Sequence, residues 1–125
     1  MRLLLDTHTV LWWFADDLRL STKARAEIAA QTNQLVVSAV VAYEIVYKQN
    51  IGRLSPLPEP LQNRLRREGI QNLPISFEHA IAAAELPGPH RDPWDRIMIA
   101  QAMTESLTVI TVDAVFDDYG VPTLW

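Results

Sequence analysis

The chain has 125 residues, nearly half of them apolar, with a formal net charge of −4 and no cysteine. This length predicts one domain, residues 1–125, with a sizeable core, and the apolar content excludes a disordered chain. The lack of cysteine excludes disulfides and thiolate metal sites, and the acidic balance excludes a basic protein that coats nucleic acid non-specifically.

The chain opens with a short apolar strand that ends in a carboxylate. Leu3, Leu4 and Leu5 form a run without alternation, which predicts a strand buried on both faces, as in parallel sheets. Asp6 follows directly, and a helix is predicted over residues 7–15. Because ligands of open α/β sheets bind beyond the carboxyl ends of the strands, Asp6 marks the place where a site would begin.

Helices and strands alternate along the rest of the chain. Further helices are predicted over residues 22–32, 39–50, 61–68, 77–86 and 93–106, and further strands over 35–38, 72–75, 107–112 and 121–124. Pro74 restricts the third strand to a sheet edge, and Asp92 followed by proline predicts a strong helix start. The pattern predicts an α/β fold: a three-layer α/β/α sandwich around a central parallel five-stranded sheet.

Four acidic residues stand apart from those in loops. Asp6 and Asp113 each follow a strand, Asp95 lies in the first turn of a helix, and Glu44 lies in an otherwise apolar helix. Strand ends and helix starts meet at one edge of a parallel sheet, where four carboxylates would repel one another without a cation. Carboxylates without histidine or cysteine partners suit Mg²⁺ or Mn²⁺, which can activate water for phosphoester hydrolysis.

Each of these acids also has an ordinary structural explanation. Asp6 and Asp113 could cap the helices that follow them, and Asp95 could complement a helix dipole. Glu44 precedes Lys48 by four residues, the spacing of a surface ion pair. Asp92 competes with Asp95 for the site, although its position favours a helix cap.

Other polar residues are candidates for supporting roles. The hydroxyls of Thr7, Ser38 and Thr111 lie beside the predicted edge and could orient the carboxylates, with backbone capping as the alternative. The candidate RNA contacts are Lys48, Arg64, Arg66, Arg67 and Arg96, with a solvated surface as the alternative for the arginines. The three histidines show no metal-binding spacing, and no glycine-rich dinucleotide or P-loop motif occurs.

The chain shows no feature that predicts a membrane protein. Its apolar start lacks a signal-peptide core of adequate length, and its longest apolar stretch, residues 35–43, is too short to span a bilayer. We therefore expect a protein of the cytoplasm with no membrane partner.

Several of these segments together resemble a known family. They are Leu3 to Thr7; Ser38 with Glu44, Ile45 and Lys48; the block Arg91 to Ala102; and Thr111 and Asp113 with Phe116. In their order and spacing they resemble the PilT N-terminal (PIN) domain, and within it the virulence-associated protein C (VapC) toxins. Two positions depart from the pattern: Val41 stands where relatives often carry a hydroxyl, and Tyr43 replaces a frequent tryptophan.

The resemblance implies a metal-dependent endoribonuclease that is the toxin of a type II toxin–antitoxin pair. It implies that Asp6, Glu44, Asp95 and Asp113 bind Mg²⁺ or Mn²⁺ and carry the hydrolysis of RNA to 5′-phosphate and 3′-hydroxyl products. It also implies a parallel five-stranded sheet between helices, a homodimer, and a cognate antitoxin whose tail blocks the site, often with a basic residue.

Two alternatives remain at this point. Asp6 and Thr7 weakly resemble the start of a haloacid-dehalogenase phosphatase motif, but His8 stands where the second aspartate belongs; turnover of a small phosphomonoester would favour this enzyme. A PIN-like binding module without activity is the second alternative, and Mn²⁺ binding without RNA cleavage would favour it.

Overall fold

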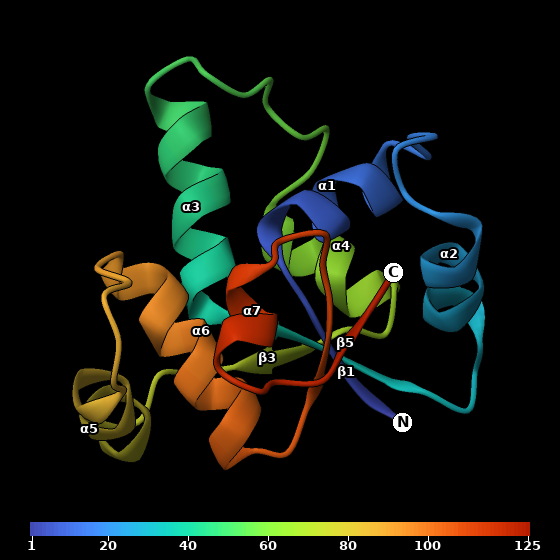
Figure 1. Ribbon diagram of the computed structural model, residues 1–125. Helices are drawn as coiled ribbons and strands as arrows, with labels where there is room; N and C mark the ends of the chain where they lie inside the picture. Colours follow the sequence, from blue (N-terminus) through green and yellow to red (C-terminus); the bar gives the residue numbers. More distant parts are fainter.

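A computed structural model describes all residues, 1–125, as an α/β domain built on one parallel sheet (Figure 1). The strands are β1 (Arg2–Leu5), β2 (Gln34–Ser38), β3 (Gln71–Leu73), β4 (Thr108–Ile110) and β5 (Thr123–Leu124). The helices are α1 (Thr7–Phe14), α2 (Thr22–Ala29), α3 (Ala39–Asn50), α4 (Leu61–Arg67), α5 (Phe77–Glu85), α6 (Pro93–Thr104) and α7 (Val115–Asp118). The predicted three-layer sandwich with five parallel strands is confirmed.

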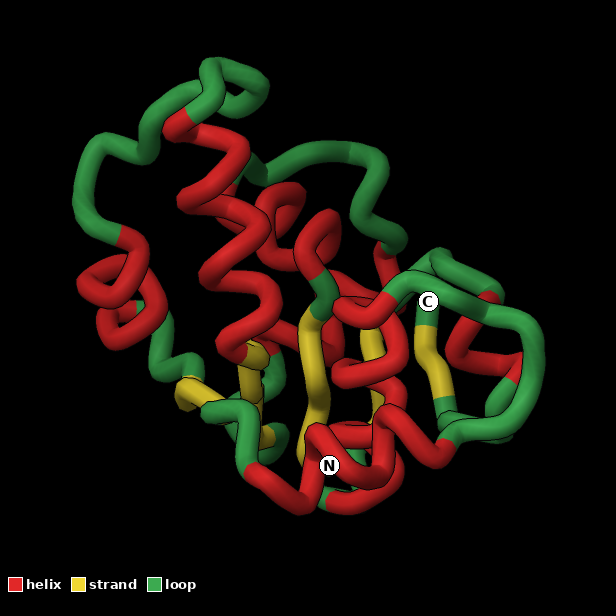
Figure 2. Tube along the Cα trace, turned by 90° about the vertical axis from the view of Figure 1, so that its left-hand side faces the viewer, coloured by secondary structure: helices red, strands yellow, loops and turns green.

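The order of the strands creates a switch point beside β1. The sheet order is β3-β2-β1-β4-β5, so β2 and β3 lie on one side of β1, and β4 and β5 lie on the other. Leu4 of β1 pairs with Val36 of β2 and with Val109 of β4, all in parallel register. Figure 2 shows the strands side by side with helices around them. A crevice at the carboxyl ends of β1 and β4 is the usual ligand position in such a sheet.

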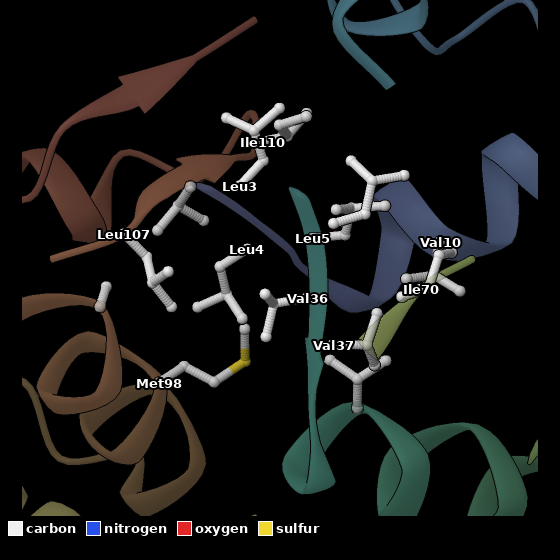
Figure 3. Close-up of a cluster of buried hydrophobic side chains, with 14 of the residues drawn as sticks. Leu3, Leu4, Leu5, Val10, Val36, Val37, Ile70, Met98, Leu107 and Ile110 are labelled. Atoms are coloured by element: carbon white, nitrogen blue, oxygen red, sulfur yellow. The ribbon is translucent and has the colours of Figure 1, made fainter. Parts of the chain in front are cut away.

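The central strand is the middle of the core. Leu3, Leu4 and Leu5 are each 0% exposed, as the unbroken apolar run predicts. Successive side chains of a strand point to opposite faces, and Figure 3 shows Leu4 beside Met98 of α6, with Leu5 near Val10 of α1. Helices on both faces of the sheet therefore pack against one four-residue strand.

The helices begin where the sequence signals place them. Side-chain oxygens of Ser21, Ser38, Ser76 and Asp92 accept hydrogen bonds from backbone N–H groups in the first turns of α2, α3, α5 and α6. Pro93 occupies the first turn of α6, where its missing N–H is not needed. No helix is both long enough and apolar enough to cross a membrane.

One helix is shorter than predicted, and one apolar helical residue is exposed. The second helix ends at Ala29 instead of residue 32, because the Asn33 side chain donates to the Glu27 carbonyl at 2.8 Å and so satisfies a carbonyl of the last turn. Ile81 of α5 is apolar but 55% exposed. The face of α5 that packs instead carries His79 and Ala83, since His79 bonds to Ser76 and to Glu105 while buried.

Replacing Leu4 with alanine should lower the free energy of unfolding by about 2–5 kcal/mol, because it leaves a cavity between closely packed layers. Urea denaturation followed by circular dichroism measures this loss. The matched control is Leu18→Ala, at a side chain that is 96% exposed, and it should change stability by less than about 0.5 kcal/mol. Equal effects of the two substitutions would contradict the central position of β1.

Candidate active site

Four carboxylates from distant parts of the chain line one pocket of about 150 Å³ at the carboxyl end of the sheet. Its lining residues are Asp6, Thr7, His8, Glu44, Lys48, Asp95, Met98, Asp113 and Phe116. A larger hollow of about 630 Å³ beside residues 86–90 contains Asp118 as its only acid. The chemistry therefore favours the smaller pocket, which lies at the switch point of the sheet.

Asp6 is held by two hydrogen bonds. Its Oδ1 accepts the backbone N–H of Thr9 at 2.9 Å and so caps α1, while its Oδ2 accepts the hydroxyl of Thr111 at 2.5 Å. Asp6 therefore both caps α1 and lines the pocket. The Thr111 contact ties the end of β1 to the residue that follows β4.

Asp113 is positioned by the same threonine. Its backbone N–H donates to the Thr111 hydroxyl oxygen at 2.9 Å, and its Oδ1 accepts the N–H of Val115 at 3.0 Å. The turn after β4 therefore carries an aspartate whose second oxygen remains without a hydrogen-bond partner in the protein.

Glu44 is oriented across the pocket by α1. Its Oε2 accepts the hydroxyl of Thr7 at 3.1 Å, which leaves Oε1 free. No ion pair forms between Glu44 and Lys48, so the surface-pair explanation of this glutamate is wrong. Both side chains line the pocket instead.

The two aspartates that open α6 have separate tasks. Asp92 accepts the N–H groups of Trp94 and Asp95 at 2.9 and 3.3 Å and is the helix cap, outside the pocket lining. Asp95 lines the pocket, and one of its oxygens lies 3.0 Å from Nε2 of His90. Burial raises the pKa of Asp95 above its usual value, the His90 hydrogen bond opposes this, and the charges of Asp92 and Asp113 raise it further.

The residues present fit a hard divalent cation. Glu44, Asp95 and Asp113 each keep one carboxylate oxygen without a hydrogen-bond partner. Together with Asp6 they offer carboxylate oxygens, the ligand type that Mg²⁺ and Mn²⁺ prefer. No three acidic or imidazole side chains are arranged to chelate an ion as they stand. Mutual repulsion keeps unneutralised carboxylates apart, so closer approach requires a positive charge between them.

The three predicted hydroxyl residues separate into two groups. Thr7 and Thr111 donate to Glu44 and Asp6, respectively. Ser38 is buried, accepts the N–H of Val40 at 3.1 Å and caps α3, so its hydroxyl lies outside the pocket lining. Backbone capping, the ordinary explanation, accounts for Ser38, whereas Thr111 both accepts a backbone N–H and donates to Asp6, and Thr7 donates to Glu44.

Of the predicted basic residues, Lys48 alone lines the pocket. Arg96 lies outside the pocket lining, and its guanidinium donates to the backbone carbonyls of Ala83, Leu86 and His90, which holds that segment in place.

The arginines of α4 lie away from the pocket. Arg64 pairs with Glu68 at 3.0 Å, and Arg67 pairs with Glu59 at 2.7 Å. Arg66 is exposed on the same helix. None of the three lines the carboxylate pocket.

Sequence reasoning missed two histidines at the site. His90 touches Asp95, and His8 lines the pocket while its ring stacks on Trp12 at 5.5 Å between centroids. His8 lies two positions after Asp6, a spacing visible in the sequence, whereas His90 is placed by the fold of a proline-rich loop.

A model of the PIN domain matches residues 3–122. The chain belongs to the PIN domain family. The predicted membership is confirmed, and the haloacid-dehalogenase alternative gains no support, since His8 replaces the aspartate that such an enzyme requires.

Individual PIN-domain relatives agree in sequence and fold. The chain is 30% identical over 113 residues to Ribonuclease VapC22 of Mycobacterium tuberculosis (strain ATCC 25618 / H37Rv), covering 88% of this chain and 85% of that protein. It superimposes with a TM-score of 0.70 on VapBC2 from Rickettsia felis bound to a promoter DNA fragment. The sequence identity is 17%, and the match covers 100% of this chain and 98% of that chain. It superimposes with a TM-score of 0.59 on a toxin–antitoxin complex from Klebsiella pneumoniae. The two chains are 18% identical, and the match covers 98% of this chain and 95% of that chain.

Replacing Asp95 with asparagine should stabilise the metal-free PIN domain at neutral pH, because it removes a carboxylate whose pKa is raised in the folded state. Below 3.8 the carboxyl is protonated in both states; above that value the unfolded chain ionises first, and the folded state loses stability as pH rises. We therefore expect a higher melting temperature for the Asp95→Asn protein near pH 7.

Scanning calorimetry in EDTA at several pH values measures this gain, which should vanish in acid. Asp92→Ala is the control and should lower the melting temperature, since a lost cap costs about 1 kcal/mol. A destabilised Asp95→Asn protein at neutral pH would refute the prediction.

Proposed function

We propose that this PIN domain is a metal-dependent endoribonuclease, the toxin of a type II toxin–antitoxin pair. The observation that carries the proposal is the gathering of Asp6, Glu44, Asp95 and Asp113 around one pocket at the switch point. The 30% identical relative named Ribonuclease VapC22 supports RNA as the substrate.

The carboxylates would share the binding of Mg²⁺ or Mn²⁺. When bound, such an ion polarises the phosphoryl oxygen and makes water a stronger nucleophile. Thr111 and Thr7 hold Asp6 and Glu44 in place through hydrogen bonds, so their oxygens face the pocket before substrate arrives.

Two further side chains would act on the substrate. Burial raises the pKa of Asp95, which suits this carboxylate to accept a proton from the attacking water. Lys48 lines the pocket without a carboxylate partner, so its ammonium is free to bind a backbone phosphate.

The same pocket would receive the antitoxin. An acidic pocket of about 150 Å³ suits one basic side chain, which would neutralise the carboxylates and exclude the metal. The toxin–antitoxin complex from Klebsiella pneumoniae supports a protein partner for this fold. We further propose a homodimer that works in the cytoplasm.

Purified protein should cleave a mixture of structured RNAs in Mg²⁺ or Mn²⁺, with 5′-phosphate and 3′-hydroxyl ends. EDTA should abolish cleavage, and Asp6→Asn should reduce it by at least about 100-fold, the typical cost of losing one group that stabilises the transition state. Asparagine is the right replacement because its oxygen can still accept from Thr9 and cap α1. Gel electrophoresis and end-labelling measure both results.

Cleavage that survives Asp6→Asn would refute this site. Mn²⁺ binding without cleavage of any RNA would favour the inactive binding module.

Asp95→Asn should abolish cleavage, whereas Asp92→Asn should retain it, because asparagine caps a helix as well as aspartate does. Initial rates on the same RNA, with melting temperatures to confirm folding, compare the two variants. Loss of activity in Asp92→Asn alone would reverse the assignment of these neighbours.

A further inference from the structure

Three aromatic side chains form a stacked row on the surface next to the carboxylate pocket. Tyr43 and Tyr47 lie one turn apart on α3, with ring centroids 5.6 Å apart and planes inclined by 6°. Trp94 at the start of α6 stacks on Tyr43 at 5.0 Å and 27°. Figure 1 shows α3 and α6 as neighbours, so two segments far apart in the sequence build the row together.

The row is not part of the core. Tyr43 is 51% exposed, Tyr47 49% and Trp94 36%, whereas Ile45, on another side of α3, is fully buried. Large rings held stacked in solvent leave apolar surface in water, and such surfaces commonly mark an interaction site.

In the sequence, each of these aromatic residues directly precedes a residue that lines the pocket. Tyr43 precedes Glu44, Tyr47 precedes Lys48, and Trp94 precedes Asp95. The three rings therefore lie on the same two helices, α3 and α6, that supply Glu44, Lys48 and Asp95 to the pocket. A polymer whose phosphate lies in the pocket would place its neighbouring units over these rings.

The charges of the protein favour an additional non-ionic contact to an anionic polymer. The chain carries a net charge of −4, and its pocket is lined by four carboxylates. Arg64, Arg67 and Arg96 are engaged with Glu68, with Glu59 and with backbone carbonyls, respectively. Lys48 is the cation of the pocket, and counterion release from so few contacts gives weak binding to phosphates.

We propose that Tyr43, Tyr47 and Trp94 form a platform on which unpaired bases of the RNA substrate stack beside the scissile phosphate. This rests on the proposed function and assigns its substrate a second contact surface, which only unpaired bases can use because paired bases do not expose their faces. Stacking on aromatic rings holds single strands without sequence readout and contributes a roughly 5- to 100-fold gain in affinity per base.

Binding of a labelled short oligoadenylate to the full chain, followed by fluorescence anisotropy in the Asp6→Asn background with Mg²⁺, tests the platform without cleavage. Tyr43→Ala and Trp94→Ala should each weaken binding about 5- to 100-fold, while Tyr43→Phe and Trp94→Phe, which keep a ring, should stay within about 2-fold. Phe77→Ala is the matched control, because Phe77 is 90% exposed on α5 and should leave affinity unchanged.

Two further measurements separate stacking from electrostatics. The alanine variants should keep the wild-type slope of log affinity against log salt, whereas Lys48→Ala should reduce it by about 0.7. The same oligonucleotide annealed to its complement, or carrying abasic sugars, should bind weakly to the wild-type surface and lose little on Tyr43→Ala.

Unchanged affinity in the alanine variants, or equal binding of the abasic strand, would overturn the platform. So would alanine variants that shift the oligomeric state by sedimentation while still binding RNA normally, since the row would then be a protein interface. If cleavage still required both the metal and Asp6, either result would leave the proposed nuclease function standing. Normal oligonucleotide binding by wild type without any cleavage would overturn the nuclease but not the platform.

Discussion

The hydrogen bond from the Thr111 hydroxyl to Asp6 joins the two strand ends on which the pocket is built. The same hydroxyl oxygen accepts the backbone N–H of Asp113, so one side chain sets the spacing of two acids that would otherwise repel each other. These contacts depend on β1 and β4 being neighbours at the switch point of the sheet. The position of the pocket therefore follows from the strand order.

The helices contribute to the site because their starting points are well defined. Asp6 caps α1 with one oxygen while the other is held by Thr111, and Asp92 caps α6 so that Asp95 is left for the pocket. A cap fixes where a helix begins, and the residue three positions further on lies in its first turn. Local backbone chemistry thus helps to position two of the four carboxylates, and Thr111 adds a long-range contact to Asp6.

The negative charge of the pocket has opposite effects on the two groups that would bind there. A group of carboxylates suits a divalent cation but repels a polyanionic substrate, and few basic side chains nearby are free to compensate. The stacked rings of Tyr43, Tyr47 and Trp94 offer attraction that does not depend on charge. The engagement of Arg96 by three backbone carbonyls serves the same site indirectly, since it holds the loop that brings His90 to Asp95.

The sequence by itself determined the fold class, the helix starts, the edge position of β3 and the chain order of the four acids. It could do so because strand periodicity, caps and proline effects are local and act within a few residues. Only the tertiary structure decided that Ser38 caps α3 outside the pocket and that Arg96 is consumed by carbonyls. It alone showed His90 beside Asp95 and the stacked rings of α3 and α6, because local sequence patterns determine neither the path of a loop nor the packing of two distant helices.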